Sequence, residues 1–211
     1  MDALLQSPIT LALLLLNLGI SLYAMMGDLS LINELSFRPV RIREQGEYYR
    51  FLTAGFVHGG GAHLAFNMIT LFFFGPLLEQ ILGAGAFLIL YFGAEIAAHA
   101  LTYVMHRTDP RYAAVGASGA ISGVVFAFCV FFPLRNLYLF FALPIPAIVF
   151  AFGYVFGSIY AMRGERRKGV VGGIAHEAHV GGALAGVVLT ILLEPRSVQI
   201  FLQSFQGLLS G

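Results

Sequence analysis

The sequence predicts an all-α polytopic membrane protein, in which six apolar helices cross a bilayer and an interfacial segment follows the first. Of its 211 residues, 58% are hydrophobic and only 11% are charged, whereas soluble domains carry roughly 25% charged residues. The mean hydropathy is +0.83, and the apolar stretches approach the ~20 residues that cross a ~30 Å hydrocarbon core. A net charge of +1 without a basic patch argues against nucleic acid as a partner.

The first predicted span covers residues 8–26. Asp2 precedes it and no Lys or Arg does, so the stretch lacks the positive region of a signal peptide and is expected to stay in the membrane. Residues 27–61 form the only long polar segment, and they mix charged side chains with aromatic and aliphatic ones. Such a mixture suits a first loop that lies in the membrane interface.

The later spans follow at short intervals. They are predicted over residues 62–82, 86–105, 116–132, 137–162 and 174–193. Pro144 and Pro146 lie in the fifth of them, so it is kinked or begins late. Because no internal repeat is evident, residues 1–195 are predicted to form one membrane domain, and the short tail 196–211 is expected at the surface.

Ser118 opens the fourth span and is the candidate nucleophile. It lies between Gly116 and Gly119, so the backbone can turn sharply and other groups can approach the hydroxyl closely. A helix N-terminus also offers free N–H donors and a positive dipole end, which would stabilise an oxyanion. The stretch has a second interpretation, because Gly119 and Gly123 form a G-x-x-x-G pair of the kind that packs helices closely in lipid.

Glycines in the sixth span favour a histidine near that serine. His179, Gly182 and Gly186 are spaced at i, i+3 and i+7, so they share one helix face. Packed against the glycines of the fourth span, this strip would let the two backbones come unusually close. The imidazole of His179 would then lie within reach of Ser118.

Two polar side chains of the second span complete a candidate catalytic set. His63 and Asn67 lie at i, i+4 on one helix face, and both can donate hydrogen bonds. A serine nucleophile needs a base within hydrogen-bond distance, and its oxyanion needs fixed donors at low dielectric. His179 would be the base, while His63, Asn67 and the Ser118 N–H would be the donors. No acid is placed to complete a triad.

In these residues the chain resembles the rhomboid intramembrane serine proteases, over residues 1–195. The matching motifs, weak singly but strong in this order, are Tyr49-Arg50 (many members have Trp-Arg), His63-x-x-x-Asn67, Gly75-x-x-x-Glu79-x-x-x-Gly83, Gly116-Ala117-Ser118-Gly119 and His179-x-x-Gly182-x-x-x-Gly186. The resemblance implies a six-helix rhomboid-like bundle with a Ser-His dyad and no metal or cofactor. It implies cleavage of transmembrane or membrane-proximal segments of other membrane proteins.

The resemblance also implies a role for each matching residue. Ser118 would be the nucleophile and His179 the base, with oxyanion donors His63, Asn67 and the Ser118 amide. Structural and packing roles would fall to Gly116, Gly119, Gly123, Gly182, Gly186, Glu79 and Arg50. The sequence departs from the family at Ser122, where members often carry a Tyr or Phe that packs against the histidine. Support for the His179 ring is then expected from Phe126 or another aromatic side chain.

One alternative interpretation is a metal site. His176-Glu177-Ala178-His179 is one residue shorter than the His-Glu-x-x-His of zinc proteases. The two imidazoles could share a metal with His58 or His63, but catalytic zinc takes three protein ligands. We therefore expect His176 to be a neighbour of the site.

Two further alternatives need no metal. A non-catalytic rhomboid-like protein would bind membrane segments without cutting them, but it would lack the serine or the histidine. A proton-coupled transporter would use Glu79, Glu95 and His99 as a relay, and inverted repeats, which would favour it, are not evident. Glu95 and His99, at i, i+4 on the third span, match no motif of the family, and mutual hydrogen bonding inside the bundle is the expectation for them.

The charge distribution and the resemblance disagree on orientation. Ten of the twelve Lys and Arg residues lie on the side of the first, third and fifth loops, which the positive-inside rule would place in the cytoplasm. The resemblance implies a cytoplasmic N-terminus and an active site that opens outward, in the inner membrane of a prokaryotic cell. We favour the family topology, because four of the ten, Arg38, Arg41, Arg43 and Arg50, lie in the interfacial first loop.

Overall fold

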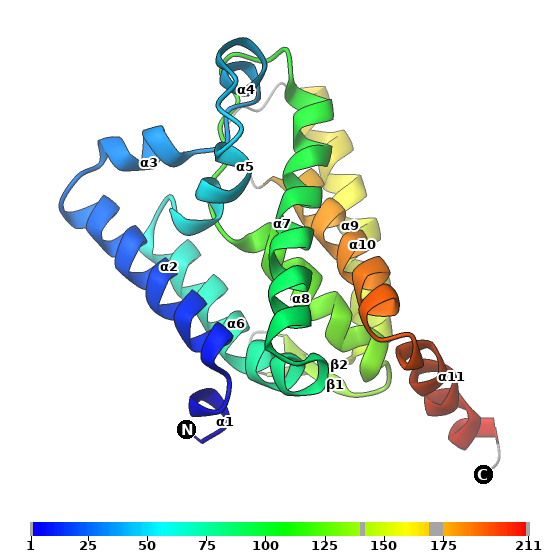
Figure 1. Cartoon of the computed structure of the whole chain (residues 1–211). Helices are drawn as coiled ribbons and strands as arrows, with labels where there is room; N and C mark the ends of the chain where they lie inside the picture. The colour runs from blue at the N-terminus through cyan, green and yellow to red at the C-terminus, as the bar shows by residue number, and fades with distance from the viewer. Residues whose placement is uncertain (1, 140–141, 169–174, 210–211) are drawn as a thin grey trace.

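The computed structural model describes residues 2–139, 142–168 and 175–209 as helices joined by short connections and one β-hairpin (Figure 1). The elements, in chain order, are α1 (Asp2–Leu5), α2 (Pro8–Met26), α3 (Ser30–Leu35), α4 (Pro39–Gln45), α5 (Arg50–Thr53), the 3-10 helix η1 (Ala54–Phe56), α6 (Gly61–Leu82), α7 (Ala84–His106), α8 (Ser118–Phe131), β1 (Asn136–Leu139), β2 (Leu143–Pro146), α9 (Ala147–Lys168), α10 (His176–Leu193) and α11 (Arg196–Leu209).

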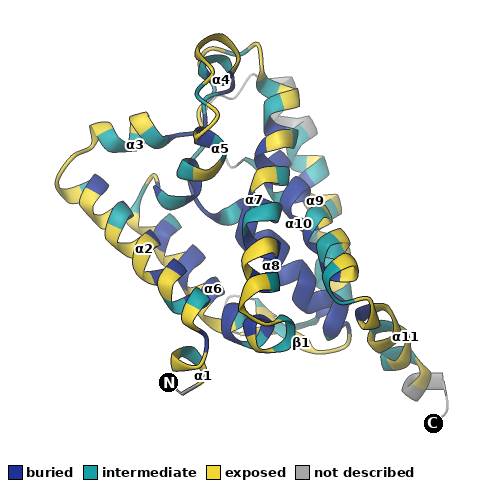
Figure 2. Ribbon diagram, viewed as in Figure 1, coloured by how far each residue is buried: buried dark blue, intermediate teal, exposed yellow. Residues whose placement is uncertain are grey.

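Four helices in the described part of the chain, α2, α6, α7 and α10, are long and apolar enough to cross a membrane. Two apolar helices are shorter: α8, and α9 over Ala147–Met162. Large apolar side chains lie exposed on several of these helices, among them Leu15, Phe66, Phe73 and Val188 (Figure 2). A helical membrane architecture is therefore confirmed, whereas the count of six spans and the interfacial position of the first loop stay predictions.

The stretch predicted to begin the fifth span differs in the structure. Strands β1 and β2 pair as an antiparallel hairpin, in which Asn136 is opposite Pro146 and Leu139 is opposite Leu143. Proline lacks the N–H that an interior helical residue donates, so the helix starts only after Pro146. The Ala147 N–H, at the start of α9, donates to the Arg135 carbonyl at 2.9 Å. Of the tail 196–211, residues 196–209 form the helix α11, which extends away from the bundle (Figure 1).

Helix α8 is the buried centre of the bundle. Each residue from Gly119 to Phe131 is buried, and α7 and α10 pack against it. A Cβ on Gly182 of α10 would lie 2.8 Å from the carbonyl carbon of Gly119, and one on Gly186 would lie 2.5 Å from the Cα of Gly123. The backbones of α8 and α10 therefore touch, with no space for a side chain between them.

Two buried charged side chains, from Glu79 and Arg50, hold the helices around α8 to one another. Glu79 of α6 accepts hydrogen bonds from the Ile9 N–H at 2.9 Å and from the N–H and hydroxyl of Thr10, both at 2.7 Å, which caps the start of α2. Arg50, 1% exposed, donates to the Ser36 carbonyl at 2.6 Å and pairs with Glu47 at 2.5 Å. Arg50 thus holds α5 against the turn between α3 and α4.

Candidate active site

Ser118 is the first residue of α8, directly after a turn that only glycine adopts easily. Gly116 has φ +108°, in the region that side chains rarely occupy. Its N–H donates to the Ala54 carbonyl at 2.9 Å, and a Cβ on it would lie 2.5 Å from the His63 ring. The glycine thus brings the start of α8 next to α6 and orients Ser118 toward the space between α6 and α10.

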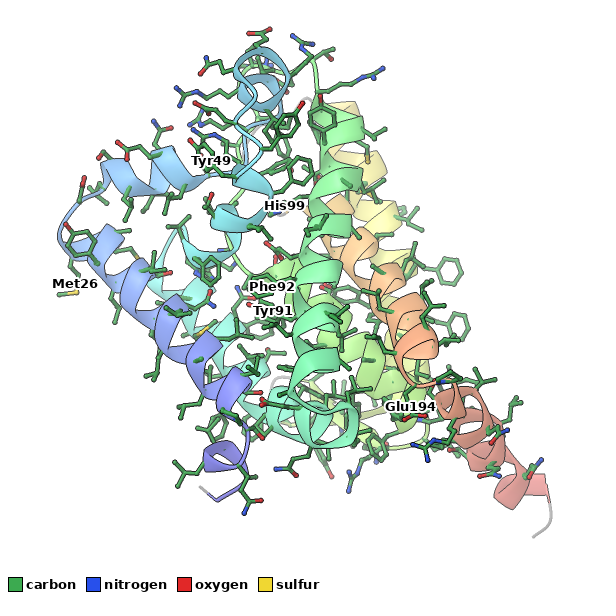
Figure 3. The ribbon with its side chains drawn as sticks, in the orientation of Figure 1. Met26, Tyr49, Tyr91, Phe92, His99 and Glu194 are labelled. Carbon is green, nitrogen blue, oxygen red and sulfur yellow. The ribbon has the colours of Figure 1, made fainter. Side chains whose placement is uncertain are left out.

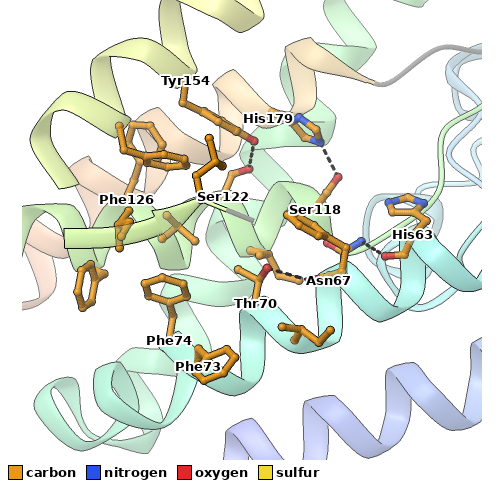
Figure 4. Close-up of a pocket in the computed structure, with 18 of the residues that line it drawn as sticks. His63, Asn67, Thr70, Phe73, Phe74, Ser118, Ser122, Phe126, Tyr154 and His179 are labelled. Atoms are coloured by element: carbon orange, nitrogen blue, oxygen red, sulfur yellow. Dashed lines mark hydrogen bonds between the residues drawn. The ribbon is translucent and has the colours of Figure 1, made fainter. Parts of the chain in front are cut away.

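Ser118 and His179 are hydrogen-bonded. His179 Nε2 lies 2.9 Å from Ser118 Oγ (Figure 4), a distance within the usual range for such a bond. The two residues come from the first turns of α8 and α10, and the glycine contacts below them set the separation of the two backbones. Among the described residues, no carboxylate is hydrogen-bonded to His179, and the hydrogen-bonded pair of Ser118 and His179 is called the dyad below.

An aromatic ring from α9 supports the histidine. The Tyr154 ring lies parallel to the His179 ring, with 6.0 Å between centroids and 27° between planes. The Tyr154 hydroxyl is 2.9 Å from Ser122 Oγ (Figure 4), so the serine that stands where the family resemblance led us to expect an aromatic residue binds the tip of this tyrosine. Phe126 contacts Tyr154, with 5.7 Å between centroids. Sequence reasoning did not find Tyr154, because no spacing along the chain relates it to His179.

His63 and Asn67 of α6 line the same cavity as the dyad. The Asn67 side-chain amide has two N–H donors, and one of them donates to the His63 carbonyl of the same helix at 3.0 Å. The structure therefore brings the four polar residues of the predicted site around one space (Figure 4). The second N–H of the Asn67 amide can donate to an oxyanion while the first stays bonded to that carbonyl.

The cavity has a volume of about 1480 Å³, more than the roughly 300–1,000 Å³ of small-ligand pockets. Apolar residues of α6, α8 and α9, such as Phe73, Phe126 and Phe150, form most of its wall, and strand β1 contributes further lining residues, such as Tyr138. It is large enough for a peptide segment that runs from the dyad along the apolar part of the bundle.

His58 supports the turn before Ser118. It is fully buried, its Nδ1 lies 2.8 Å from Ser21 Oγ, and the Ser21 hydroxyl donates to the Phe56 carbonyl at 2.9 Å. The Nδ1 of His58 therefore carries the proton, and Nε2 faces the Ala117 N–H at 3.4 Å. Burial, and then the neighbouring His63, lower the pKa of His58 to about 4. Nothing in the sequence identified this role.

The metal interpretation finds no geometric support in the described part of the chain, where no three His, Cys, Asp or Glu side chains are grouped to hold an ion. Glu177, which the motif would use, instead accepts a hydrogen bond from the Tyr112 hydroxyl and lies 3.2 Å from His106 Nε2. The start of α10 is thereby attached to the loop that precedes α8.

Comparison with known proteins places the chain among related membrane proteins. A family model described as the Rhomboid domain matches residues 45–196. The rhomboid-type protein YdcA of Bacillus subtilis is 44% identical over 89 residues, which cover 41% of this chain and 44% of that protein. The rhomboid protease GluP of the same organism is 32% identical over 145 residues, 69% of this chain and 27% of GluP.

A mitochondrial relative matches as well. The human presenilin-associated rhomboid-like protein is 34% identical over 140 residues, which are 64% of this chain and 35% of that protein. The matched part is thus less than half the length of each of these relatives.

Proposed function

Since the chain belongs to the rhomboid family, we propose that it is an intramembrane serine protease that cleaves transmembrane or membrane-proximal segments of other membrane proteins. The observation that carries this proposal is the 2.9 Å hydrogen bond between His179 Nε2 and Ser118 Oγ. A serine hydroxyl becomes a useful nucleophile when a base at this distance accepts its proton.

The proposed reaction has two stages. Ser118 Oγ attacks the scissile carbonyl carbon while His179 Nε2 accepts the hydroxyl proton. When the resulting tetrahedral intermediate collapses, the C–N bond breaks and His179 returns the proton to the leaving amine. Water then attacks the acyl-enzyme, again with His179 as the base, and releases the second product together with a free Ser118.

Donors for the oxyanion are proposed at the start of α8 and on α6. The Ser118 N–H is at a helix N-terminus, where the first amide groups have no partner within the helix. His63 and Asn67 lie across the cavity from it. The apolar wall keeps the local dielectric low, which strengthens each of these hydrogen bonds to developing charge.

The substrate class follows from the shape and chemistry of the cavity. Its apolar wall includes residues beside the dyad and residues of β1, so an apolar peptide segment can lie along it with its scissile bond at Ser118. No cofactor is needed for this chemistry.

Serine-directed labelling and cleavage together test the proposal. A fluorophosphonate probe should label the reconstituted protein, and a helical transmembrane substrate with small residues should be cut. Ser118→Ala and His179→Ala should each abolish both signals, whereas Ser204→Ala, which removes a partly exposed serine of α11, should change neither. Cleavage retained by either dyad variant would reject the mechanism. A wild-type protein that binds such segments but neither reacts nor cuts would indicate the non-catalytic alternative.

Orientation is a separate proposal. Tyr49 of the first loop and Glu194 after α10 lie at opposite ends of the bundle (Figure 3), so the bundle carries its arginine-rich first loop at one end. We propose that the end with Glu194 and the C-terminus faces the cytoplasm of a prokaryotic cell, with the dyad opening outward. A reporter protein that is active only in the cytoplasm should be active when it is fused at residue 211. If a reporter that is active only after export is active there instead, the orientation is the reverse.

A further inference from the structure

We propose that Glu95 of α7 is a positioning residue for the dyad: it caps the N-terminus of α8 from a neighbouring helix and so leaves the amide groups beside Ser118 free for the oxyanion. This inference rests on the proposed protease function. Glu95 is 2% exposed, and its Oε2 accepts a hydrogen bond from the Ala120 N–H at 2.8 Å. Ala120 is the third residue of the helix that Ser118 begins.

Helix α8 has no cap of its own. The N-cap position is Ala117, which makes no side-chain hydrogen bond, although the first amide groups of a helix need acceptors from outside it. A Ser, Thr, Asp or Asn at this position would take the N–H of the second or third helical residue. Such a side chain would then stand beside Ser118, where the substrate carbonyl has to bind.

The carboxylate of Glu95 satisfies the first turn from the opposite side. It takes the Ala120 N–H, while in the part of the chain that the structure describes neither the Ser118 nor the Gly119 N–H donates a hydrogen bond. The cap therefore orders the helix start without occupying the two donors nearest the nucleophile. This division matches the need for preorganised, unoccupied donors at an oxyanion site.

Glycines make room for the carboxylate. A Cβ on Gly55 would lie 2.6 Å from Glu95 Oε1, and a Cβ on Gly119 would lie 3.1 Å from Oε2 and 2.6 Å from Ala98 Cβ. Two glycines, one after α5 and one in α8, thus allow the carboxylate to sit between η1, α7 and α8. A side chain at either position would displace it.

His99 lies next to Glu95 but is not its hydrogen-bond partner. The distance from His99 Nδ1 to Glu95 Oε1 is 3.6 Å, whereas the same Nδ1 lies 2.8 Å from the Phe51 carbonyl, which can only accept (His99 is labelled in Figure 3). The ring stacks on Phe37 at 4.3 Å with 6° between planes. The expected mutual hydrogen bond of Glu95 and His99 is therefore replaced by two bonds to backbone groups, one in α5 and one in α8.

One oxygen of Glu95 has no hydrogen-bond donor among the described residues. A buried carboxylate oxygen without a donor is destabilising, so folding alone does not favour a glutamate here over an apolar side chain of similar size. The capping contact with Ala120 gives the residue a role that an apolar side chain cannot fill.

The test compares an apolar and a polar replacement of equal size. Glu95→Leu removes the acceptor and should lower kcat for a transmembrane substrate about 10- to 100-fold, as expected when a nucleophile is misplaced by about 1 Å or less, with KM changed less than about twofold because the cavity wall is untouched. Glu95→Gln keeps an oxygen acceptor for the Ala120 N–H and should restore most of kcat. Wild-type kcat in Glu95→Leu, or a Gln variant as slow as the Leu variant, would overturn the proposal.

Thr102→Val is the matched control, because Thr102 is a buried polar residue of the same helix. Its hydroxyl donates only to the Ala98 carbonyl of α7, at 3.1 Å. The kcat of the Thr102→Val variant should equal that of the wild type. If Glu95→Leu fails to fold, the amide proton resonance of Ala120 in Glu95→Gln decides the question. That resonance should shift relative to wild type, and an unshifted one would reject the cap. This measurement does not depend on proteolysis. It can therefore reject the Glu95 cap without rejecting the proposed protease function, and the reverse.

Discussion

Gly182→Ala should separate α8 from α10 and disable the dyad. The new Cβ would lie 2.8 Å from the Gly119 carbonyl carbon and closer still to the carbonyl oxygen, whereas ordinary contact begins at 3.4 Å. The obstacle is backbone inside a buried helix, so it cannot rotate away as a side chain would. The helices must therefore move apart by about 1 Å, at a cost of roughly 1–3 kcal/mol in stability for overpacking.

That displacement acts directly on the reacting groups. Gly119 follows Ser118 in the chain, and Gly182 is less than one helical turn from His179. A 1 Å misplacement of reacting groups costs roughly 100-fold in rate, so we expect kcat to fall about 100-fold and the detergent-solubilised protein to unfold at lower temperature. Rates of fluorophosphonate labelling should fall in parallel, because the 2.9 Å bond between the two side chains would be stretched.

Gly19→Ala in α2 is the control for this substitution. It makes the same chemical change in a membrane helix, but its Cβ would meet nothing within 4 Å, so turnover and unfolding temperature should stay at wild-type values. Labelling of Gly182→Ala at the wild-type rate would show that the glycine contact does not set the geometry of the dyad, and the reasoning above would fail.

Four further predictions concern residues around the site. Asn67→Ala should reduce kcat roughly 100- to 1000-fold if its amide serves the oxyanion, and an unchanged kcat in the cleavage assay would assign that role elsewhere. Tyr154→Ala should slow labelling about 10-fold through loss of ring stacking on His179, whereas Tyr154→Phe, which keeps the ring, should lose less than about threefold. Because the pKa of His58 is lowered from 6.5 to about 4, the unfolded chain binds the proton first, and stability should fall by up to about 3 kcal/mol between pH 6.5 and 4; urea unfolding of His58→Gln should lack this acid-induced loss. Glu79→Leu should lower the unfolding temperature but leave the kcat of the folded fraction unchanged, since the helix that Glu79 caps carries no residue of the site.

Hydropathy predicted the long helices of this fold because a lipid-facing helix must be apolar over its whole length. Hydropathy could not identify the β1–β2 hairpin, because a short apolar run is equally consistent with a helix and with a strand. Pro144 and Pro146 were the local clue: they predicted a kink or a late start for the fifth span, and α9 begins late, at Ala147. The extension of the tail into α11 was not predicted.

The candidate site also has a part that could be predicted from the sequence and a part that could not. His179, Gly182 and Gly186 lie on one helix face, so their relation could be derived from spacing alone, and the structure brings that face to Ser118. The ring that supports His179 comes from α9, which no sequence spacing connects to α10. Likewise, the spacing of Glu95 and His99 suggested that they bind each other, whereas their shorter contacts are to backbone atoms of other helices.

Glu79 and Glu95 show how a bundle of this composition can satisfy its buried helix ends. In α2 the N-cap residue Ser7 uses its hydroxyl to donate to the Ala3 carbonyl rather than to cap, and in α8 the N-cap is an alanine. In both cases a glutamate from an adjacent helix accepts the N–H of the third helical residue. A carboxylate at that position also interacts favourably with the helix dipole, so the two glutamates perform the same structural task. Only the second stands behind a nucleophile, and for that reason its removal should change kcat, whereas removal of the first should change stability alone.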